Sequence, residues 1–588
     1  MSAIYFEKND TVKKELEEFS EKVEAFKDGS LDGDEFKHRR LIQGVYGQRQ
    51  PEKFMVRVKI PAGHLTSEMV EGLAETSDKF ADGNVHITTR QDVQLYYVNV
   101  DSLIPLLDRL ADFGITTREA SGATIRNVIT SAFAGSLREQ SFNILPIVET
   151  VVRYFLRHPE TQHLPRKFKL SFSENEDDLG VTSINDMGFI ARIVDGKPGF
   201  KLMLGGSLGS TPIISRVYKE FVPAEELLLE IFSVLRAFER HGNRAKRAEA
   251  RLKFQFEKMG YDTFVELAKK EKAGILEEKV EFPELKIDIP KVEDFDFSNP
   301  FDKEIQVDRF TWFNSNVKPT IRKDEYMVII QIPNGDIKTN TFRALSEAHK
   351  EWNGKNTTEF ITLMDSQNLI LKGLVTTPEK KKEFFGNVFK TLKNLGLEKP
   401  GYHHMADVLT CLGSATCASG ITHSPGLALV LSEKMRNVWF EDERFRDSTV
   451  HVSGCSNSCA RHQIATLGFS GRADKTFEDG QEAPAYNLFY GGALLPDGKA
   501  RLARKVTEKL LAKRIPSFIQ ALVSYFKEKA SPEISFSNFI AEMDENEMNT
   551  LVNQFSVNTS PVEADEMIHY DWGKERPYVM EYGEGECS

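Results

Sequence analysis

The segment Phe54-Met-Val-Arg-Val-Lys-Ile-Pro61-Ala-Gly63 has a counterpart much later in the chain, Tyr326-Met-Val-Ile-Ile-Gln-Ile-Pro333-Asn-Gly335. Met, Val, Ile, Pro and Gly stand in register in the two segments. In the first segment apolar and basic side chains alternate with a period of two, which is typical of a β-strand that ends in a Pro-Gly turn. The recurrence indicates that the chain contains the same structural unit twice.

The repeat extends in both directions from this segment. A helix pattern over about residues 66–80 is followed by a second strand pattern over 86–98, and residues 86–96 match 360–370. Later, residues 200–206 match 486–492, each with a Gly-Gly turn after which we expect a helix. The period is too long for a solenoid, so we predict an α+β fold of tandem-duplicated halves with pseudo-twofold symmetry. The junction between such halves is a natural place for a shared ligand.

Size and composition limit the class of protein. A chain of 588 residues is too long for one core, and its net charge of −12 argues against general nucleic-acid binding. We find no apolar run long enough to span a membrane, and the first ten residues lack the apolar stretch of a signal peptide. We therefore expect a cytoplasmic protein with no membrane partner and no nucleic-acid partner.

Four of the five cysteines lie in one region, as Cys411 and Cys417 in a C-x5-C pair and Cys455 and Cys459 in a C-x3-C pair. Both pairs lie among Gly, Ser and Ala, where the backbone can wrap closely around a bulky inorganic core. Structural zinc sites usually have shorter spacings, and disulfides are unlikely when the only other cysteine is Cys587 at the chain's end. The pattern therefore favours an iron–sulfur cluster held by four thiolates.

The first copy has no cysteine and instead concentrates cations, which predicts that it binds something polyanionic. They are Arg90, Arg118, Arg126, Arg166, Lys167, Lys169, Arg244, Lys246, Arg247, Arg251 and Lys253. Arg251 and Lys253 are two residues apart and would point to the same side of a strand. Spacing alone leaves open that these two lie on the solvent face of an amphipathic segment.

These motifs together resemble the sirohaem- and [4Fe–4S]-containing sulfite and nitrite reductases. The resemblance covers nearly the whole chain. It rests on the two cysteine pairs, 126–128, 164–169, 185–187, 242–244, 367–369, both Gly-Gly turns, and the closing segment 571–587. It implies three domains around the cofactors, one of them a ferredoxin-like domain formed jointly by the two half-copies.

The expected boundaries follow from the repeat and this resemblance. They are an N-terminal helical extension (1–50), a first ferredoxin-like half-domain (51–120), a first sirohaem- and substrate-binding domain (121–274), a linker (275–320), a second ferredoxin-like half-domain (321–400), a [4Fe–4S]- and sirohaem-binding domain (401–550), and a C-terminal tail (551–588).

The resemblance also implies roles for individual residues. Cys411, Cys417, Cys455 and Cys459 would hold the cluster, and the Cys459 thiolate would also be the axial ligand of the sirohaem iron. Sirohaem is a polycarboxylate, so it needs dense cationic and hydrogen-bonding support. The expected cofactor-binding residues are Arg126, Asn127, Gln367, Asn368, Gly205, Gly206, Gly491, Gly492 and Asn457. The expected catalytic residues, which bind the substrate anion, are Arg90, Arg166, Arg251 and Lys253.

The activity implied is the six-electron reduction of sulfite to sulfide. A further cation at Lys253 suits sulfite, which is larger and more highly charged than nitrite. Members of the family that reduce nitrite tend to lack this cation. A nitrite reductase and a non-catalytic sirohaem/iron–sulfur electron-transfer protein stay open as alternatives.

The electron donor is a separate question. We find no convincing flavin or nicotinamide motif, so we expect electrons from a ferredoxin or a separate flavoprotein. The basic residues near the cysteines in sequence that could face such a donor are Lys434, Arg436, Arg444, Arg446, Arg461 and Lys475. Cys587 is most simply a free thiol.

Overall fold

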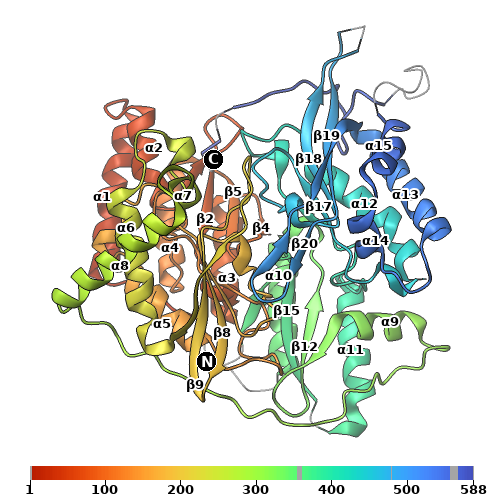
Figure 1. Cartoon of the computed structure of the whole chain (residues 1–588), viewed down its shortest axis with the longest axis horizontal. Coiled ribbons are helices and arrows are strands. Elements are labelled where there is room, and N and C mark those ends of the chain that lie inside the picture. The colour runs from red at the N-terminus through yellow and green to blue at the C-terminus, as the bar shows by residue number, and fades with distance from the viewer. Residues whose placement is uncertain are drawn as a thin grey trace.

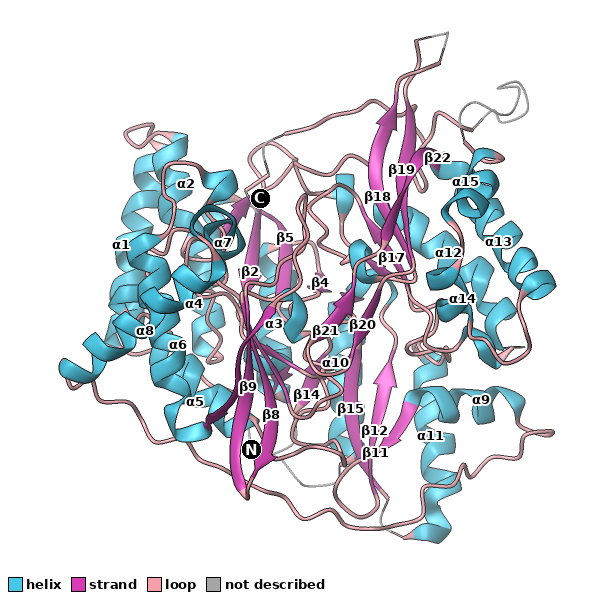
Figure 2. Cartoon of the chain, in the orientation of Figure 1, coloured by secondary structure: helices cyan, strands magenta, loops and turns pink. Residues whose placement is uncertain are grey.

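The two copies lie beside each other in the computed structural model, the N-terminal copy on the left and the C-terminal copy on the right of Figure 1. Strands occupy the middle of this view and helices its two flanks (Figure 2). The structure describes residues 3–353, 360–375, 377–440, 442–477, 480–556, 567–583 and 585–586.

Two five-stranded antiparallel sheets each contain one strand from the opposite copy. The first has the order β1 (Val45–Gly47), β2 (Phe54–Val58), β5 (Val93–Val98), β4 (Asn84–Ile87), β13 (Asp336–Lys338). The second has the order β11 (Val317–Pro319), β12 (Glu325–Ile330), β15 (Leu369–Leu374), β14 (Ile361–Leu363), β3 (His64–Leu65). Ile337 pairs with Val85, and Thr362 pairs with His64. The exchange joins the two half-domains through backbone hydrogen bonds, as the expected joint domain requires.

Glycine makes this exchange possible. Gly63 and Gly335 close the two Pro-x-Gly turns, and both have a φ of +74°. A Cβ on Gly63 would lie 2.4 Å from the carbonyl oxygen of Leu363, and one on Gly335 would lie 2.5 Å from that of Ile87. Leu363 belongs to β14 and Ile87 to β4, so each glycine faces a strand of the other copy. The motif that reveals the duplication in the sequence is therefore also the point where the copies touch.

Two further five-stranded sheets carry the parts of the chain that hold the predicted site. Their orders are β10 (Arg216–Pro223), β9 (Lys197–Leu204), β8 (Met187–Val194), β7 (Leu170–Ser173), β6 (Ile129–Thr130), and β22 (Arg504–Leu511), β19 (Ala483–Tyr490), β18 (Leu467–Asp474), β17 (Val450–Ser453), β16 (Leu409–Thr410). In both, the three strands at one end are parallel and the other pairings are antiparallel. A hairpin of β20 (Ala493–Leu495) and β21 (Lys499–Arg501) completes the strands of the described residues.

Helices cover the outer faces of these sheets. They are α1 (Asp10–Lys27), α2 (Gly33–Leu41), α3 (Ser67–Phe80), α4 (Leu103–Asp112), α5 (Leu145–Phe155), α6 (Leu227–His241), α7 (Leu252–Met259), α8 (Tyr261–Glu277), α9 (Val307–Asn316), α10 (Thr339–Trp352), α11 (Lys381–Asn394), α12 (Ser424–Phe440), α13 (Ile515–Lys529), α14 (Phe536–Glu542) and α15 (Glu545–Asn553). The largest apolar core contains side chains of both copies, among them Val56 and Val328. The other two large cores each belong mainly to one copy.

The predicted α+β duplication is confirmed, and several local predictions are refined. The helix expected over 66–80 is α3, whose N-cap Thr66 accepts a hydrogen bond from the Met69 amide. The strand expected over 86–98 is wrong in detail, because a turn over 88–92 divides it into β4 and β5. The helices expected after the two Gly-Gly turns are α6 and α13, and strands lie between each turn and its helix.

The energetic cost of a Cβ at Gly63 has two parts, one from the backbone conformation and one from the close approach to β14, and a comparison with Gly196 separates them. Gly196 also has a φ of +74°, but no atom lies within 4 Å of the position that a Cβ would take there. Gly196→Ala is expected to cost about 1–2 kcal/mol for the left-handed conformation alone. Gly63→Ala is expected to cost about 1–3 kcal/mol more, because β14 must move. Equal shifts of the two variants in thermal unfolding would show that the two copies do not depend on this contact.

Candidate functional site

The four cysteines of the two pairs converge at the ends of two neighbouring strands. Cys411 follows β16, and Cys455 lies just beyond β17. Burial raises the pKa of the Cys455 thiol well above its usual range, and the neighbouring Cys459, Cys411 and Cys417 act in the same direction. All four are free thiols, and Cys587 lies outside the described residues. Several thiolates this close together repel one another, so they need a cationic group between them to ionise.

A four-iron cluster and a single metal ion require different arrangements of their ligands. Among the described residues, no three His, Cys, Asp or Glu side chains lie close enough together to hold one metal ion. In a four-iron cubane each thiolate binds a different iron, so the four sulfurs stand further apart than the ligands of one ion. Cys459, Cys411 and Cys417 lie near enough to Cys455 to raise its pKa, which agrees with four thiols gathered around one cluster.

Small residues and two hydrogen bonds shape the backbone around Cys411. The Gly454 amide donates to the Cys411 sulfur at 3.2 Å. The hydroxyl of Ser424, the first residue of α12, donates to the Cys411 carbonyl at 2.7 Å. A Cβ on Gly454 would lie 2.5 Å from the Cα of Gly413, so only glycine lets the two cysteine-bearing segments approach this closely.

The turn that carries Arg90 contacts the turn that carries Cys459. The Thr89 hydroxyl donates to the Cys459 carbonyl at 3.0 Å. In return, the guanidinium of Arg461 donates to the Thr89 carbonyl and forms an ion pair with Asp365 at 2.6 Å. The turn that precedes Arg90 in the first copy is thus bonded directly to the turn that carries Cys459 in the second.

Arg90 is held in place by two acceptors while one of its donors stays unused. It donates to the Asn185 side chain at 3.0 Å and to the Asn127 carbonyl at 2.5 Å. Burial lowers its pKa to about 9, and nearby Arg126 and Arg461 act in the same direction. The guanidinium remains charged at neutral pH, and within the described structure its Nε is buried without a hydrogen-bond partner.

Arg251 and Lys253 do not lie on a strand as the spacing suggested. Arg251 is the N-cap of α7, and Lys253 lies in its first turn. The alternation of charged and apolar residues over so few positions cannot separate a strand from the start of a helix. Both side chains are nonetheless buried, which excludes the solvent-facing alternative.

These two cations have different partners. Arg251 forms a bidentate pair with Asp186, at 2.8 and 2.9 Å, so an acid already compensates its charge. In the described part of the chain, Lys253 donates to backbone carbonyls, those of Leu208 at 3.5 Å and Thr211. Burial lowers the Lys253 pKa to about 8, and Arg251 contributes in the same direction. Lys253 is therefore the less compensated of the two.

The loop that receives Lys253 also contacts the second copy. Gly209 in this loop donates its amide to the Gln463 side chain at 3.1 Å and accepts from it at 2.7 Å. Gln463 lies four residues after Cys459. Lys253 is therefore linked to the cysteine region through one loop and one side chain.

Arg166 lies buried in the segment that leads into β7, and Lys167 and Lys169 follow it. Burial lowers the pKa of Lys169 well below its usual range, and the charges of Arg90, Arg251 and Lys167 add to this effect. Arg90, Arg251 and Lys167 therefore lie near enough to Lys169 to affect its charge, as expected for the wall of an anion site.

The expected cofactor residues Arg126, Asn127, Gln367 and Asn368 are buried and already bonded within the chain. Arg126 donates to the Tyr46 hydroxyl at 3.1 Å and to the Ala120 carbonyl at 3.0 Å. Asn127 donates to the carbonyl of Ile60 at 2.7 Å. These contacts fix the strand ends around the site.

Gln367 and Asn368 likewise fix strand ends around the site in the second copy. Gln367 accepts from the Thr410 amide at 3.1 Å, next to Cys411, and donates to the Ile87 carbonyl at 3.0 Å. Asn368 donates to Asp407 at 2.8 Å. In the first copy the corresponding contact is made by Gln91, which the sequence did not single out and which accepts from the Thr130 amide at 3.0 Å; the structural register of this segment differs by two residues from the sequence match of 86–96 with 360–370.

The Gly-Gly turns do not offer most of their amides to a ligand. The amides of Gly205, Gly491 and Gly492 donate to backbone carbonyls within their own copies. A Cβ on Gly206 would lie 2.4 Å from the Ser183 carbonyl oxygen, so this glycine is needed for close packing. Asn457 lies between Cys455 and Cys459, and its backbone amide hydrogen-bonds to the Cys455 sulfur.

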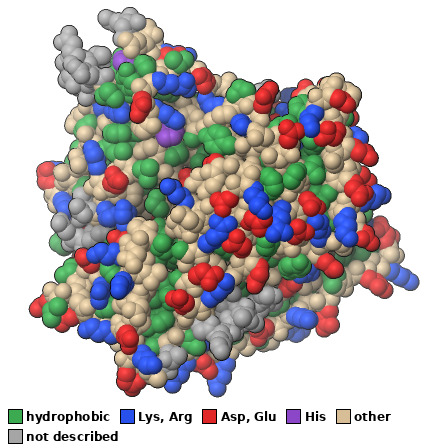
Figure 3. Space-filling model, turned by 180° about the vertical axis from the view of Figure 1, so that it is seen from behind, with side chains coloured by type: hydrophobic (Ala, Val, Ile, Leu, Met, Phe, Trp, Pro, Cys, Tyr) green, Lys and Arg blue, Asp and Glu red, His purple; other side chains and the backbone are tan. Residues whose placement is uncertain are grey.

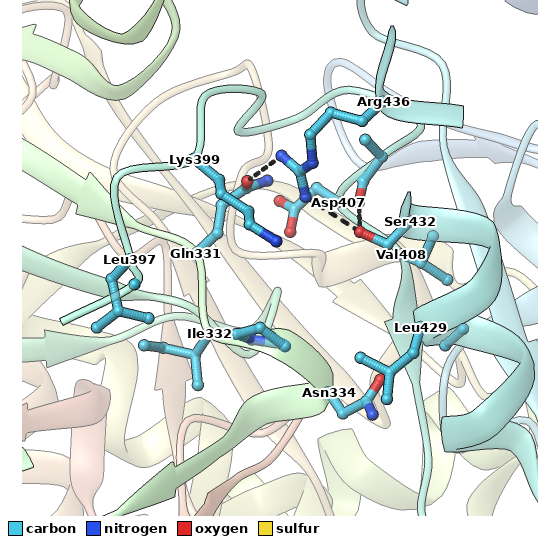
Figure 4. A pocket seen from close by; sticks show the side chains of 14 residues that line it. Gln331, Ile332, Asn334, Leu397, Lys399, Asp407, Val408, Leu429, Ser432 and Arg436 are labelled. Atoms are coloured by element: carbon cyan, nitrogen blue, oxygen red, sulfur yellow. Dashed lines mark hydrogen bonds between the residues drawn. The ribbon is translucent and has the colours of Figure 1, made fainter. Parts of the chain in front are cut away.

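A cavity of about 40 Å³ lies beside Asp407, between the Pro333–Gly335 turn and α12 (Figure 4). It has room for little more than one or two water molecules, so it is not the place of a macrocycle. Arg436 lines it and donates to the Pro400 carbonyl at 2.8 Å and the Ser432 hydroxyl at 3.2 Å. Arg461 is buried, which contradicts its place among the candidates for a donor-facing surface, whereas Arg436 is partly exposed.

The surface shows no simple segregation of charge on the face drawn in Figure 3, where basic and acidic side chains are interspersed. Of the remaining donor candidates, Arg444 pairs with Asp442 at 2.7 Å and Lys475 with Glu482 at 2.6 Å. No helix in the described parts of the chain is long and apolar enough to cross a membrane.

Several buried donors at the junction fit a polyanionic ligand. Within the described residues, Arg90 Nε, Gln91 Nε2, Ser183 Oγ and Ser458 Oγ are buried without a hydrogen-bond partner. Unpaired buried donors are costly, and they occur here on the turns where the two copies meet. A ligand with many carboxylates placed against them would satisfy these groups, so the residues present fit sirohaem.

Besides Gln91, sequence reasoning gave no role in this site to Asp186, Arg461 and Gln463. Asp186 and Gln463 were overlooked because their partners, Arg251 and Gly209, are distant in the chain. For Arg461 a signal existed, because it follows Cys459 by two residues, but a single arginine is usually exposed.

Comparisons with known proteins agree with this site. A family model for the nitrite/sulfite reductase ferredoxin-like half domain matches residues 46–113, and one for the nitrite and sulphite reductase 4Fe-4S domain matches residues 121–275. The second match falls on the first copy, which has no cysteines, so it reflects the shared fold of the duplicated unit.

Relatives of both activities align over most of the chain. The sulfite reductase [ferredoxin] of Mycobacterium tuberculosis is 26% identical over 84% of this chain and 83% of its own. The ferredoxin–nitrite reductase of Synechococcus elongatus is 24% identical over 84% of this chain and 90% of its own. The solved structure of the M. tuberculosis NirA protein has the same fold, with a TM-score of 0.74 and 23% identity over 91% of this chain and 97% of that one.

The duplicated fold, the four converging thiols and these matches confirm the resemblance seen in the sequence. The chain resembles the sulfite and nitrite reductases over most of its length and contains two domains that match models of that family; it is an oxidoreductase whose cofactors are a [4Fe–4S] cluster and sirohaem.

Proposed function

We propose that this protein reduces sulfite to sulfide, taking up six electrons, with Cys411, Cys417, Cys455 and Cys459 as the cluster ligands. Arg90, Arg166 and Lys253 bind the substrate anion, and Arg251 is held by Asp186 as a positioning residue. The observation that carries the choice of sulfite is Lys253, a buried cation whose hydrogen-bond acceptors are neutral carbonyls. A doubly charged oxyanion gains more from such a cation than singly charged nitrite does.

The cluster and sirohaem, when bound, would supply the redox chemistry of the reduction. The chain's own task is to hold the oxyanion and to deliver protons to its oxygens. Arg90 presents an Nε–H that has no partner among the described residues, and guanidinium groups bind oxyanions through directed hydrogen bonds. Donors fixed before the reaction stabilise charge that develops on a departing oxygen without having to reorganise.

Lys253 is suited to proton transfer as well as binding. Its pKa of about 8 lies close to neutral pH, so it can give up a proton more readily than an exposed lysine. The Lys253 ammonium can donate to a leaving oxygen as water forms and can be protonated again between steps. The hydrogen bonds to the loop at Leu208 and Thr211 keep the ammonium in place.

The electron donor we propose is a ferredoxin. Support comes from the relatives, two of which are named as ferredoxin-dependent reductases of sulfite and nitrite. A relative from Anoxybacillus flavithermus is named as the haemoprotein component of an NADPH sulfite reductase, so a separate flavoprotein is the competing donor. Turnover with each purified donor at equal reducing power distinguishes the two.

The ligand assignment can be tested by metal content. Cys411→Ser is expected to reduce iron and acid-labile sulfide in the purified protein to a small fraction of the wild-type amounts, because the cluster loses one of its four thiolates. Cys587→Ser is the matched control, since it removes the cysteine outside the set and should leave both contents unchanged. Full retention of iron and sulfide in Cys411→Ser would contradict the assignment.

The substrate assignment is tested by Lys253→Met, which keeps a long side chain without the charge. Loss of one charge-assisted hydrogen bond is worth about 1.5–3 kcal/mol, so kcat/KM for sulfite should fall about 10- to 100-fold. The value for nitrite should change much less. Equal losses for both anions would show that Lys253 does not discriminate between them, and a higher wild-type kcat/KM for nitrite would overturn the choice of sulfite.

A pH profile tests the charge state of Lys253 directly. Below about pH 8 the lysine is protonated and binds the anion, so kcat/KM for sulfite should fall as the pH rises through about 8. Lys253→Arg stays charged to a higher pH and should lose this descending limb. Ionisation of sulfite itself affects both proteins alike, so a limb that is the same in both would exclude Lys253 as its cause.

A further inference from the structure

The C-terminal segment of residues 567–583 and 585–586, which we call the strap, runs along the loop of residues 415–423 that carries Cys417. At its start the His423 amide donates to Asp571 at 2.6 Å. The His423 ring donates its Nδ1–H to the Trp572 carbonyl at 2.7 Å, since a carbonyl can only accept. Further on, the Tyr578 hydroxyl donates to the Ile421 carbonyl at 3.0 Å.

The end of the strap continues the same contact. The Gly583 amide donates to the Ala418 carbonyl at 2.9 Å. A Cβ on Gly585 would lie 1.8 Å from the Ser419 hydroxyl oxygen, so the strap passes the loop at a distance that only glycine allows. The strap therefore follows the loop residue by residue instead of touching it at one point.

The first copy holds both the loop and the strap. Arg49 donates to the Cys417 carbonyl at 3.2 Å and, with the same guanidinium, to the Glu581 carboxylate at 3.0 Å. Its amide also donates to the Thr416 carbonyl at 2.9 Å. One arginine thus connects the first copy, the cysteine loop and the strap.

Glu586 forms the last anchor. Its carboxylate accepts from Arg40 at 2.7 Å and from the Gly47 amide at 2.8 Å, and the Arg40 and Glu586 side chains are only 7% and 12% exposed. An ion pair this well shielded, with a further hydrogen bond to the carboxylate, is stronger than a surface pair. The first copy therefore contacts the strap at Glu586 and the cysteine loop at Cys417, and the strap and the loop contact each other.

We propose that the strap is a positioning element that fixes the Cys417 loop in the geometry that binds the cluster, with Glu586, Arg40 and Tyr578 as the positioning residues. This inference rests on the proposed cluster ligands. Tyr578 acts on the backbone of the loop directly, whereas Arg40 and Glu586 act by anchoring the end of the strap to the first copy. Loosening the strap should therefore leave the thiols present but less well placed.

The test compares Glu586→Gln with Glu15→Gln in the full-length protein. Glu15 is a fitting control because it forms a bidentate pair with Arg157 at 2.8 and 3.0 Å, is 19% exposed, and lies in α1 away from the cysteines. Glu586→Gln should speed the loss of iron to a ferrous chelator about tenfold, in line with the loss of one charge-assisted interaction. Glu15→Gln should leave that rate unchanged.

Hydrogen exchange separates positioning from general stability. In Glu586→Gln, exchange at the amides of residues 417–421 should accelerate, while exchange in α5 and α13 should not. Tyr578→Phe removes only the hydrogen bond to Ile421, so it supplies the same test if Glu586→Gln folds poorly. Unchanged exchange at 417–421 in both variants would overturn the proposal, as would equal acceleration throughout the protein.

The two proposals can fail separately. If the wild-type protein binds no iron and no labile sulfide, the cluster assignment fails, and hydrogen exchange on the iron-free protein still decides whether the strap orders the loop. If wild type holds its cluster and Glu586→Gln loses it no faster than Glu15→Gln does, the strap proposal alone is wrong.

Discussion

The site depends on the contact between two turns, one from each copy of the repeat. The Thr89 hydroxyl bonds the carbonyl of Cys459, and Arg461 bonds the carbonyl of Thr89. This contact brings the turn beside Arg90 in the first copy against the turn that carries Cys459 in the second. Each copy alone therefore has half of the chemistry, and the duplication is functional only because the halves are docked.

The buried cations around that contact differ in whether an acid is bonded to them. Arg251 is matched by Asp186, and Arg461 by Asp365. Arg90 and Lys253 instead have neutral acceptors, which leaves their charge available. A buried cation that has no hydrogen-bonded acid gains the most from an anionic ligand. The distribution of paired and unpaired cations thus marks the part of the site where anions belong.

The duplication could be predicted from the sequence because the two Pro-x-Gly turns, at 61–63 and 333–335, need glycine for their backbone conformation. Such a need is visible in the residue type itself. The four cysteines could also be predicted as a set from the sequence, because their spacing along the chain indicates the kind of site. Sequence reasoning failed where the answer depends on long-range partners: Arg461 was assigned to the surface because Asp365 and Thr89 are remote in the chain. It did not reveal that Arg251 and Lys253 lie at the start of α7, because local alternation does not separate a strand from the first turn of a helix.

The exchanged strands have a consequence for how the protein is made. When the ribosome has produced only the first copy, β4 has no β13 beside it, and β3 has no β14 to join. The nascent chain then exposes unpaired strand edges, which are templates for aggregation. We expect such half-made chains to need chaperones, and a gene split between the copies to yield soluble protein only when both fragments are produced together.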